Sequence, residues 1–189
     1  MGTYELIRSR RSIRKFQQKK IDRKKLEKMI DAARLAPSAA NMQPLKYIIA
    51  DEADKTEAIF NCLKWAGYIT PAGDPGEGEH PVAYIILLVD KQIRESGYEL
   101  DAGAAAQSIF LTALEDGIGS CWLGAVDREG IRKLLGIPER YLINTVIALG
   151  YPAESPVEVE AAGSVRYYKD ENGVLHVPKR KLEEVILKL

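Results

Sequence analysis

DAGAAAQSIFLTALEDGIGSCWLG, residues 101–124, is the stretch that decides the fold. Its first part predicts a helix that starts at an Asp101 N-cap and keeps one apolar stripe. Glycines at 117 and 119 then turn the chain into a segment typical of a strand, residues 120–126. The first turns carry almost no large side chains, so we expect either a subunit contact or a tightly packed core helix. The stripe consists of Ala102, Ala105, Ala106, Ile109, Phe110 and Ala113.

Helices and strands flank this stretch without strict alternation. The apolar run 82–89 predicts a strand that is central in a sheet covered on both faces. Further strands are predicted at 46–50 and 144–149, and Asn172-Gly173 predicts a hairpin between 165–168 and 174–177. This mixture favours an α+β layered domain over a doubly wound one. Helices are predicted at 4–8, from an Asp22 cap to Pro37, at 53–65, at 128–135 before Gly136, and around Leu182, Val185, Ile186 and Leu189.

Size and composition limit the class of protein. A chain of 189 residues with 46% hydrophobic content predicts a single domain over residues 1–189. No apolar run approaches the roughly 20 residues that a membrane-spanning helix needs, and the charged N-terminus lacks a secretory signal, so we expect a cytoplasmic protein. Two cysteines and two histidines exclude a disulfide framework and a zinc-type ligand set.

Charge is balanced overall but unevenly distributed. Lysine plus arginine equal aspartate plus glutamate at 27 each, which argues against nucleic acid or anionic lipid as partners. One basic cluster occupies residues 8–25, and a second occupies 179–181. The two clusters could converge on one anion. The alternative, a nucleic-acid contact by the first cluster, predicts strongly salt-dependent binding.

Common catalytic motifs are missing from the sequence. The glycine-rich GIGSCWLG at 117–124 lacks the spacing of a dinucleotide fingerprint and precedes a strand where that fingerprint opens a helix. No Walker loop, Gly-x-Ser-x-Gly elbow or His-Glu-x-x-His pair occurs.

Four ordered segments together resemble the nitroreductase family of FMN enzymes. They are RRSIRKF at 10–16, PSAANMQP at 37–44, residues 101–124, and ALGYP at 148–152 combined with PKRKLEEV at 178–185. The resemblance implies a central, mainly antiparallel sheet flanked by helices, and a homodimer with FMN at the subunit interface. It also implies NADH or NADPH as reductant and a nitroaromatic, quinone or similar small molecule as acceptor, in a ping-pong mechanism.

The resemblance assigns the basic residues to FMN, whose phosphate carries nearly two negative charges and whose ring gains negative charge on reduction. It implies that Arg10, Arg11 and Ser12 bind the phosphate end. Lys179 and Arg180 of the second cluster would contact the same phosphate. Arg14 would contact the ribityl chain and the pyrimidine edge. Taken without the family, the same tract is an ordinary solvated basic face.

Backbone contacts complete the implied site. Pro37, Ser38 and Asn41 would meet the flavin bound mainly to the other subunit, although without the family they form a turn in which Asn41 tolerates unusual φ. Leu123 and Gly124 would present a backbone N–H to flavin N5, and a strand-end glycine is the alternative. No side chain is implied as a catalytic acid, because the cofactor performs the hydride chemistry.

Several features stay open at this level. Lys64 could add a second cation at the pyrimidine, and Trp65 and Tyr68 could line a substrate pocket beneath a mobile 70–81 loop. Some similar proteins dehalogenate substrates or consume the flavin itself. A protein of the same fold could also bind FMN without turnover by NAD(P)H.

Overall fold

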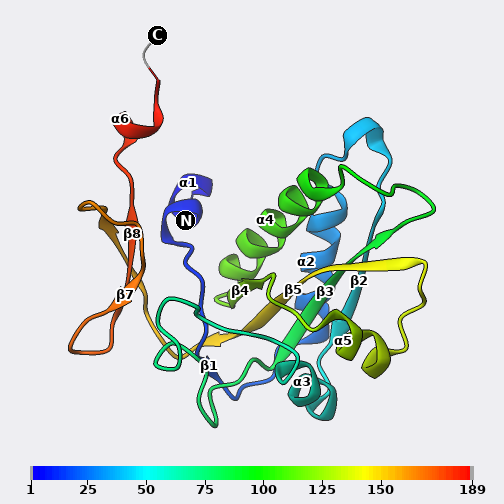
Figure 1. Ribbon diagram of the computed structural model, residues 1–189, viewed down its shortest axis with the longest axis horizontal. Coiled ribbons are helices and arrows are strands. Elements are labelled where there is room, and N and C mark those ends of the chain that lie inside the picture. The colour runs from blue at the N-terminus through cyan, green and yellow to red at the C-terminus, as the bar shows by residue number, and fades with distance from the viewer. Residues whose placement is uncertain (1, 188–189) are drawn as a thin grey trace.

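The computed structural model describes residues 2–187 and contains one five-stranded sheet and one three-stranded sheet (Figure 1). Every pairing in the larger sheet is antiparallel, in the order β1-β5-β3-β2 with β4 also on β5. The expected α+β fold is confirmed. The strands are β1 (Phe16–Gln17), β2 (Leu45–Ala50), β3 (Ala83–Asp90), β4 (Gly119–Leu123) and β5 (Tyr141–Pro152).

Helices cover both faces of the larger sheet. α2 (Arg23–Arg34) and α4 (Glu99–Glu115) pack on one face, and α3 (Ala53–Phe60) and α5 (Arg128–Leu135) lie on the other (Figure 1). All eight residues of β3 are buried, as the prediction of a strand covered on both faces requires. Two apolar cores, one on each face, therefore hold the sheet rigidly between the helices.

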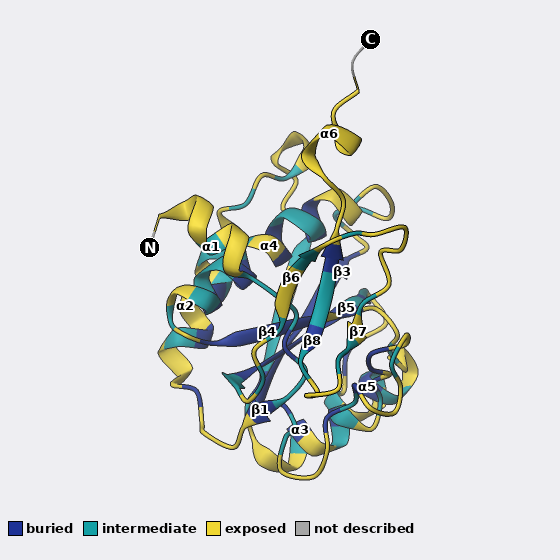
Figure 2. Cartoon of the chain, turned by 90° about the vertical axis from the view of Figure 1, so that its left-hand side faces the viewer, coloured by how far each residue is buried: buried dark blue, intermediate teal, exposed yellow. Residues whose placement is uncertain are grey.

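The C-terminal part forms the smaller sheet, in which β8 (Leu175–Lys179) lies between β6 (Val157–Glu160) and β7 (Tyr168–Lys169). The short helices α1 (Thr3–Ser9) and α6 (Leu182–Val185) contain no buried residue, in contrast to β3 and β5 (Figure 2). The apolar side chains of α6 are accordingly exposed, and Leu189 lies outside the described residues.

Two predicted helix ends were wrong. α4 begins at Glu99 after a Tyr98 N-cap, so Asp101 lies inside the first turn. Its carboxylate accepts hydrogen bonds from the Ser38 hydroxyl and the Ala39 amide and does not cap the helix. α3 ends at Phe60 and not at Trp65, because Leu63 forms a β-bridge with Val126. The Asp22 cap is confirmed, since its side chain accepts from the Lys24 amide at 2.9 Å.

The predicted hairpin exists with a longer turn. Of Asn172 and Gly173 only the glycine has positive φ, at 76°. The Asp170 carboxylate accepts from the amides of Asn172 at 3.0 Å and Val174 at 2.8 Å. The first strand is consequently short, Tyr168–Lys169, where 165–168 was expected.

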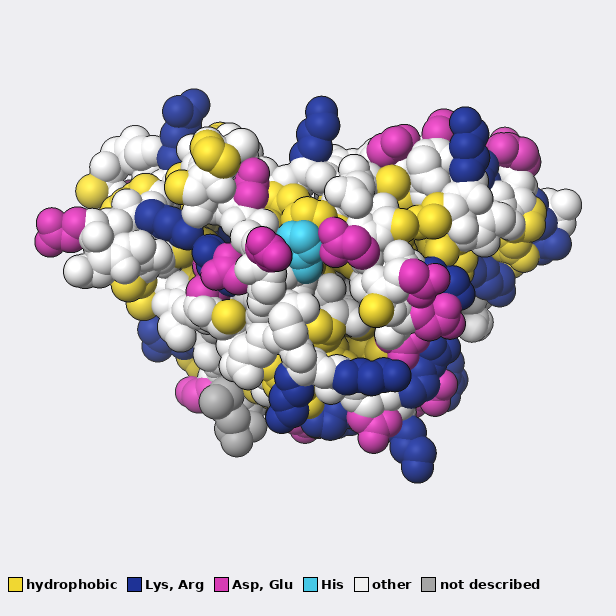
Figure 3. Space-filling view, turned by 90° about the horizontal axis from the view of Figure 1, so that it is seen from below, with side chains coloured by type: hydrophobic (Ala, Val, Ile, Leu, Met, Phe, Trp, Pro, Cys, Tyr) yellow, Lys and Arg dark blue, Asp and Glu magenta, His cyan; other side chains and the backbone are white. Residues whose placement is uncertain are grey.

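Among residues 2–187, no helix is long and apolar enough to cross a membrane, and no three metal-binding side chains come together. On the face drawn in Figure 3, acidic and basic side chains lie intermixed, and the histidine at its centre lies beside acidic groups.

Candidate functional site

Residues 10–14 run along the C-terminal end of α4 and the start of β4. Ser12 forms a parallel bridge with Ser120, and the Ile13 amide donates to the Ser120 carbonyl at 2.9 Å. Gly119 is required here, because a Cβ at that position would lie 2.8 Å from Ile13 Cγ1. This close contact fixes the basic segment against the larger sheet.

Arg10 and Arg11 differ in their partners. Arg11 forms an ion pair with Glu158 and donates to the Arg8 carbonyl at 2.5 Å. The Arg10 guanidinium lies 5.9 Å from the centre of the Phe110 ring and has no carboxylate partner within the described chain. Burial, followed by the charge of Arg11, lowers the pKa of Arg10. Arg10 is thus a partly buried cation that an anion would stabilise.

Arg14 is held by its backbone and leaves a polar atom unsatisfied. Glu154 Oε1 accepts from the Arg14 amide at 2.6 Å and from the Lys15 amide at 3.3 Å. The Arg14 guanidinium lies 5.0 Å from the centre of the Tyr167 ring, and its Nε is buried without a hydrogen-bond partner. Buried donors are nearly always paired, so this Nε points to a missing acceptor.

Gly124, directly after the end of β4, lines a cavity of about 520 Å³, while the side chain of Leu123 before it is buried. Thr145 Oγ1 donates to the Leu123 carbonyl at 2.6 Å and fixes the backbone there. A Cβ added to Gly124 would meet nothing within 4 Å. Lys64 lines the same cavity, and its amide donates to the Ala125 carbonyl at 3.0 Å.

Cys121 in the same strand is a core residue. It is 3% exposed, and burial raises its pKa to about 11. A protonated, buried thiol of this kind is a poor nucleophile.

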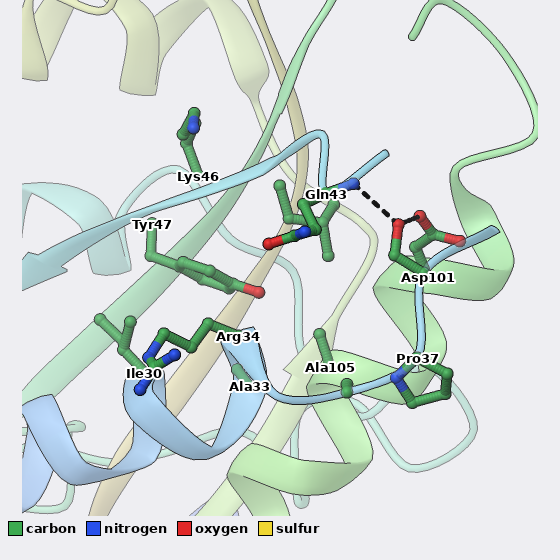
Figure 4. Close-up of a pocket in the computed structure, with 12 residues that line it drawn as sticks. Ile30, Ala33, Arg34, Pro37, Gln43, Lys46, Tyr47, Asp101 and Ala105 are labelled. Carbon is green, nitrogen blue, oxygen red and sulfur yellow. Dashed lines mark hydrogen bonds between the residues drawn. The ribbon is translucent and has the colours of Figure 1, made fainter. Parts of the chain in front are cut away.

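Residues 37–43 form a loop at the other end of α4 (Figure 4). Ser38 Oγ donates to Asp101 at 2.6 Å and accepts from the Gln43 amide at 2.9 Å, while the Ala39 amide donates to Asp101 at 3.1 Å. Asn41 has φ of 54°, as its residue type allows, and Ala40 and Gln43 also have positive φ. Such strained backbone is typical of functional sites.

A cavity of about 320 Å³ lies beneath this loop, between α2, β2 and the start of α4 (Figure 4). Pro37 and Ser38 form part of its wall. Burial raises the pKa of Tyr47, on its floor, to about 12. The loop therefore joins a structured pocket and is not a free surface turn.

One chain does not bring the two halves of the implied flavin site together. Asp101 anchors the 37–43 loop, and Phe110 lies under Arg10, nine residues further along α4. A rise of 1.5 Å per residue separates these positions by about 14 Å. Within one chain, the 37–43 loop and the 10–14 segment therefore lie at opposite ends of α4.

The second basic cluster lies apart from the first. Lys179 ends β8, and its carbonyl accepts from the Ala161 amide at 2.8 Å. Arg180 lines a cavity of about 420 Å³ with Tyr68 and Arg166, and this cavity shares no lining residue with the one at Arg10.

Comparison with known proteins shows the family of this chain. A model of the nitroreductase family matches residues 7–74 and 80–151. The chain belongs to the nitroreductase family. A Methanothermobacter thermautotrophicus protein with the provisional name NADH dehydrogenase/NAD(P)H nitroreductase is 35% identical over 161 residues, covering 82% of this chain and 80% of that protein.

Solved structures of the nitroreductase family share the fold. An FMN-dependent nitroreductase from Clostridium difficile R20291 has a TM-score of 0.68 at 29% identity, covering 80% of this chain and 88% of that one. A provisionally named nitroreductase from Desulfovibrio desulfuricans, solved in complex with FMN, has a TM-score of 0.72 at 21% identity. Its match covers 100% of this chain and 97% of that one.

The residues of this nitroreductase-family chain fit FMN chemically. The unpaired Arg10 suits a phosphate, and the orphaned Arg14 Nε suits a carbonyl or ring nitrogen. The open space over Gly124 accepts a flat group against the backbone.

Sequence reasoning missed three residues of this site. Glu154 clamps the Arg14 backbone, Phe110 supports Arg10, and Tyr167 covers Arg14. Of these three residues, only Glu154 had a signal in the sequence, because its carboxylate closely follows the ALGYP segment at 148–152.

Replacing Asp101 with alanine is expected to free the 37–43 loop and to destabilise the fold. Ser38 Oγ and the Ala39 amide lose a buried carboxylate, at a cost of about 1.5–3 kcal/mol per bond. Urea unfolding measures this change. Glu99→Ala is the control, because Glu99 is an exposed acid in the same turn of α4. Equal stability of the two variants would contradict the assignment.

Proposed function

We propose that this chain is an FMN-dependent oxidoreductase that passes hydride from NADH or NADPH to a nitroaromatic, quinone or similar small acceptor. The observation that carries the proposal is the buried, unpartnered Nε of Arg14 in the same segment as the unpaired Arg10, which runs along the start of β4 in a nitroreductase fold. Bound FMN would supply the hydride chemistry through its N5.

The phosphate end of the cofactor site falls to the chain's own N-terminal segment. Arg10 supplies a charge-assisted hydrogen bond, and burial against Phe110 strengthens its field. Ser12 is fixed by its bridge to Ser120 and supplies a hydroxyl. Arg11 contributes positive potential while remaining paired with Glu158.

The ring end falls to Arg14 and to the backbone after β4. Glu154 holds the Arg14 amide, so the guanidinium is preorganised to stabilise negative charge at the pyrimidine edge. Leu123 and Gly124 would offer backbone to a flat ring, and Lys64, which lines the same cavity as Gly124, is a second cation for the same charge. These groups would position and polarise the flavin ring, and none of them would transfer a proton.

A homodimer completes the site in this proposal. Each α4 carries the 37–43 loop at one end and the 10–14 segment at the other, so two antiparallel copies would form two equivalent sites. Pro37, Ser38 and Asn41 of one subunit would then contact the cofactor held by the other. Reductant and acceptor would use one face in turn, which is the basis for ping-pong kinetics.

Steady-state kinetics test the proposal. FMN-loaded protein should oxidise NADH or NADPH with a nitrofuran or menadione as acceptor, and double-reciprocal plots at several acceptor concentrations should be parallel. Protein that retains FMN without any NAD(P)H oxidation would instead be a flavin-binding protein. Double-reciprocal plots whose lines converge would contradict the ping-pong mechanism.

A further inference from the structure

The backbone that leaves β4, residues 123–126, is held by donors from outside it. Thr145 Oγ1 donates to the Leu123 carbonyl at 2.6 Å, and the Lys64 amide donates to the Ala125 carbonyl at 3.0 Å. Arg128 donates to the two remaining carbonyls, each at 3.4 Å. All four carbonyls of this stretch, which we call the 123–126 segment, are therefore fixed.

Arg128 ties the 123–126 segment to β5. Its Nε donates to the Ile143 carbonyl and its Nη2 donates to the Asn144 carbonyl, both at 2.9 Å. The two longer bonds to the 123–126 segment come from the same guanidinium. Because a guanidinium is planar and rigid, one side chain can hold several carbonyls in fixed relative positions. The flexible ammonium of a lysine cannot replace it in this arrangement.

Thr145 decides which way the next N–H points. In a trans peptide the carbonyl and the N–H point in opposite directions, so a donor on the Leu123 carbonyl directs the Gly124 N–H the other way. Thr145 is a buried residue of β5, and its hydroxyl therefore acts from inside the sheet. The Gly124 N–H consequently points away from β5.

The pairing of β4 gives the same direction independently. β5 occupies one edge of β4, and on the other edge the Ile13 amide donates to the Ser120 carbonyl at 2.9 Å. Backbone groups of every second residue in a strand face the same edge. Gly124 follows Ser120 by four residues, so its N–H faces the edge along which residues 10–14 run. The buried, unpartnered Nε of Arg14 belongs to that same stretch.

A backbone N–H fixed at this edge suits N5 of an oxidised flavin ring. The Gly124 N–H would donate to the lone pair of that nitrogen, and most of this bond would be lost once N5 carries a hydrogen. A well-directed N–H therefore stabilises oxidised FMN more than reduced FMN. Hydrogen bonds of this kind are one way in which a protein tunes a cofactor.

We propose that Thr145 and Arg128 are positioning residues for hydride transfer. They fix the Leu123–Gly124 peptide so that its N–H meets flavin N5, and they thereby lower the reduction potential of bound FMN. The inference rests on the proposed function, because it assumes that the ring lies at this edge of β4. Both residues act through the backbone and not by contact with the reacting atoms.

Thr145→Val tests the contact directly, because it removes the hydroxyl and nearly preserves the shape of the side chain. This variant should bind oxidised FMN about 3- to 10-fold more weakly, with the affinity for reduced FMN unchanged. The two-electron potential should then rise by about 15–30 mV, since a tenfold change in the equilibrium constant corresponds to about 30 mV. Dithionite titration of the FMN-loaded protein with a reference dye measures the potential. Thr145→Ser, which retains the hydroxyl, should have the wild-type potential.

Two further variants separate this effect from a loss of stability. Thr56→Val is the matched control, because Thr56 is also buried and its hydroxyl donates to the Ala53 carbonyl at 3.0 Å in α3. It should lower the thermal midpoint and leave the potential unchanged. Arg128→Lys keeps the charge but loses the planar set of bonds, and it should raise the potential in the same direction as Thr145→Val. Its potential is a second, independent measurement of the claim.

Three results would overturn the proposal: a wild-type potential in Thr145→Val, an equal upward shift in Thr145→Ser, or an equal shift in Thr56→Val. An unchanged potential in Arg128→Lys would overturn the role of Arg128. The titration uses a chemical reductant, so a protein that binds FMN but is not reduced by NAD(P)H counts against the proposed function alone. A protein that takes up no FMN would overturn both.

Discussion

Replacing Gly103 with arginine should convert the protein to a monomer and abolish FMN binding together. Gly103 lies on α4 where a Cβ would meet nothing within 4 Å, so one chain accommodates a larger side chain. Arginine also has a higher helix propensity than glycine, by about 0.8–1 kcal/mol. The folded chain should therefore remain stable, and the loss should come from the contact between two copies of α4.

Light scattering after size exclusion measures the mass, and the flavin absorbance of the same peak measures bound FMN. Gly103→Ala is the matched control, because it adds the helix propensity with a single methyl group. We expect this control to stay dimeric and loaded. A dimeric, FMN-loaded Gly103→Arg protein would contradict both the role of α4 and the sharing of the site between subunits.

Replacing Gly124 with valine should weaken FMN binding about 5- to 150-fold, equivalent to about 1–3 kcal/mol of overpacking. The position has no positive φ and no neighbour within 4 Å of an added Cβ, so the thermal midpoint should barely change. The effect should come from a flavin ring that approaches the backbone after β4. Gly124→Ala should give an intermediate loss.

Flavin fluorescence titration measures the affinities, and thermal unfolding without FMN is the control for stability. Gly136→Ala is a matched comparison that removes a glycine with positive φ at the end of α5, away from the site. It should lower stability and leave FMN affinity unchanged. Wild-type FMN affinity in Gly124→Val would place the ring elsewhere.

The sequence predicted elements whose cause is local. The apolar run of β3, the Asp22 cap of α2 and the small-residue stripe of α4 each reflect a periodicity or a residue preference, and each is present. Asn41 was predicted to tolerate unusual φ for the same reason.

Features that depend on distant partners were not predicted. α3 ends early because Leu63 pairs with Val126, 63 residues away. Ala40 and Gln43 are ordinary residues, and their positive φ accompanies a loop that Asp101 anchors from α4. Arg14 and Tyr167 are in contact although most of the chain separates them in sequence, and no local pattern indicates such a pair. The basic residues were recognisable from sequence, but their separate cavities were not.

The central claim is that the chain holds FMN and that a nicotinamide nucleotide reduces it. The most direct measurement is the absorbance spectrum of the purified, FMN-reconstituted protein under anaerobic conditions, before and after addition of NADPH or NADH. The account predicts a yellow protein with FMN equimolar to the chain, whose flavin band is bleached by the nucleotide. A protein that takes up no added FMN, or whose bound flavin keeps its absorbance with both nucleotides, would contradict it.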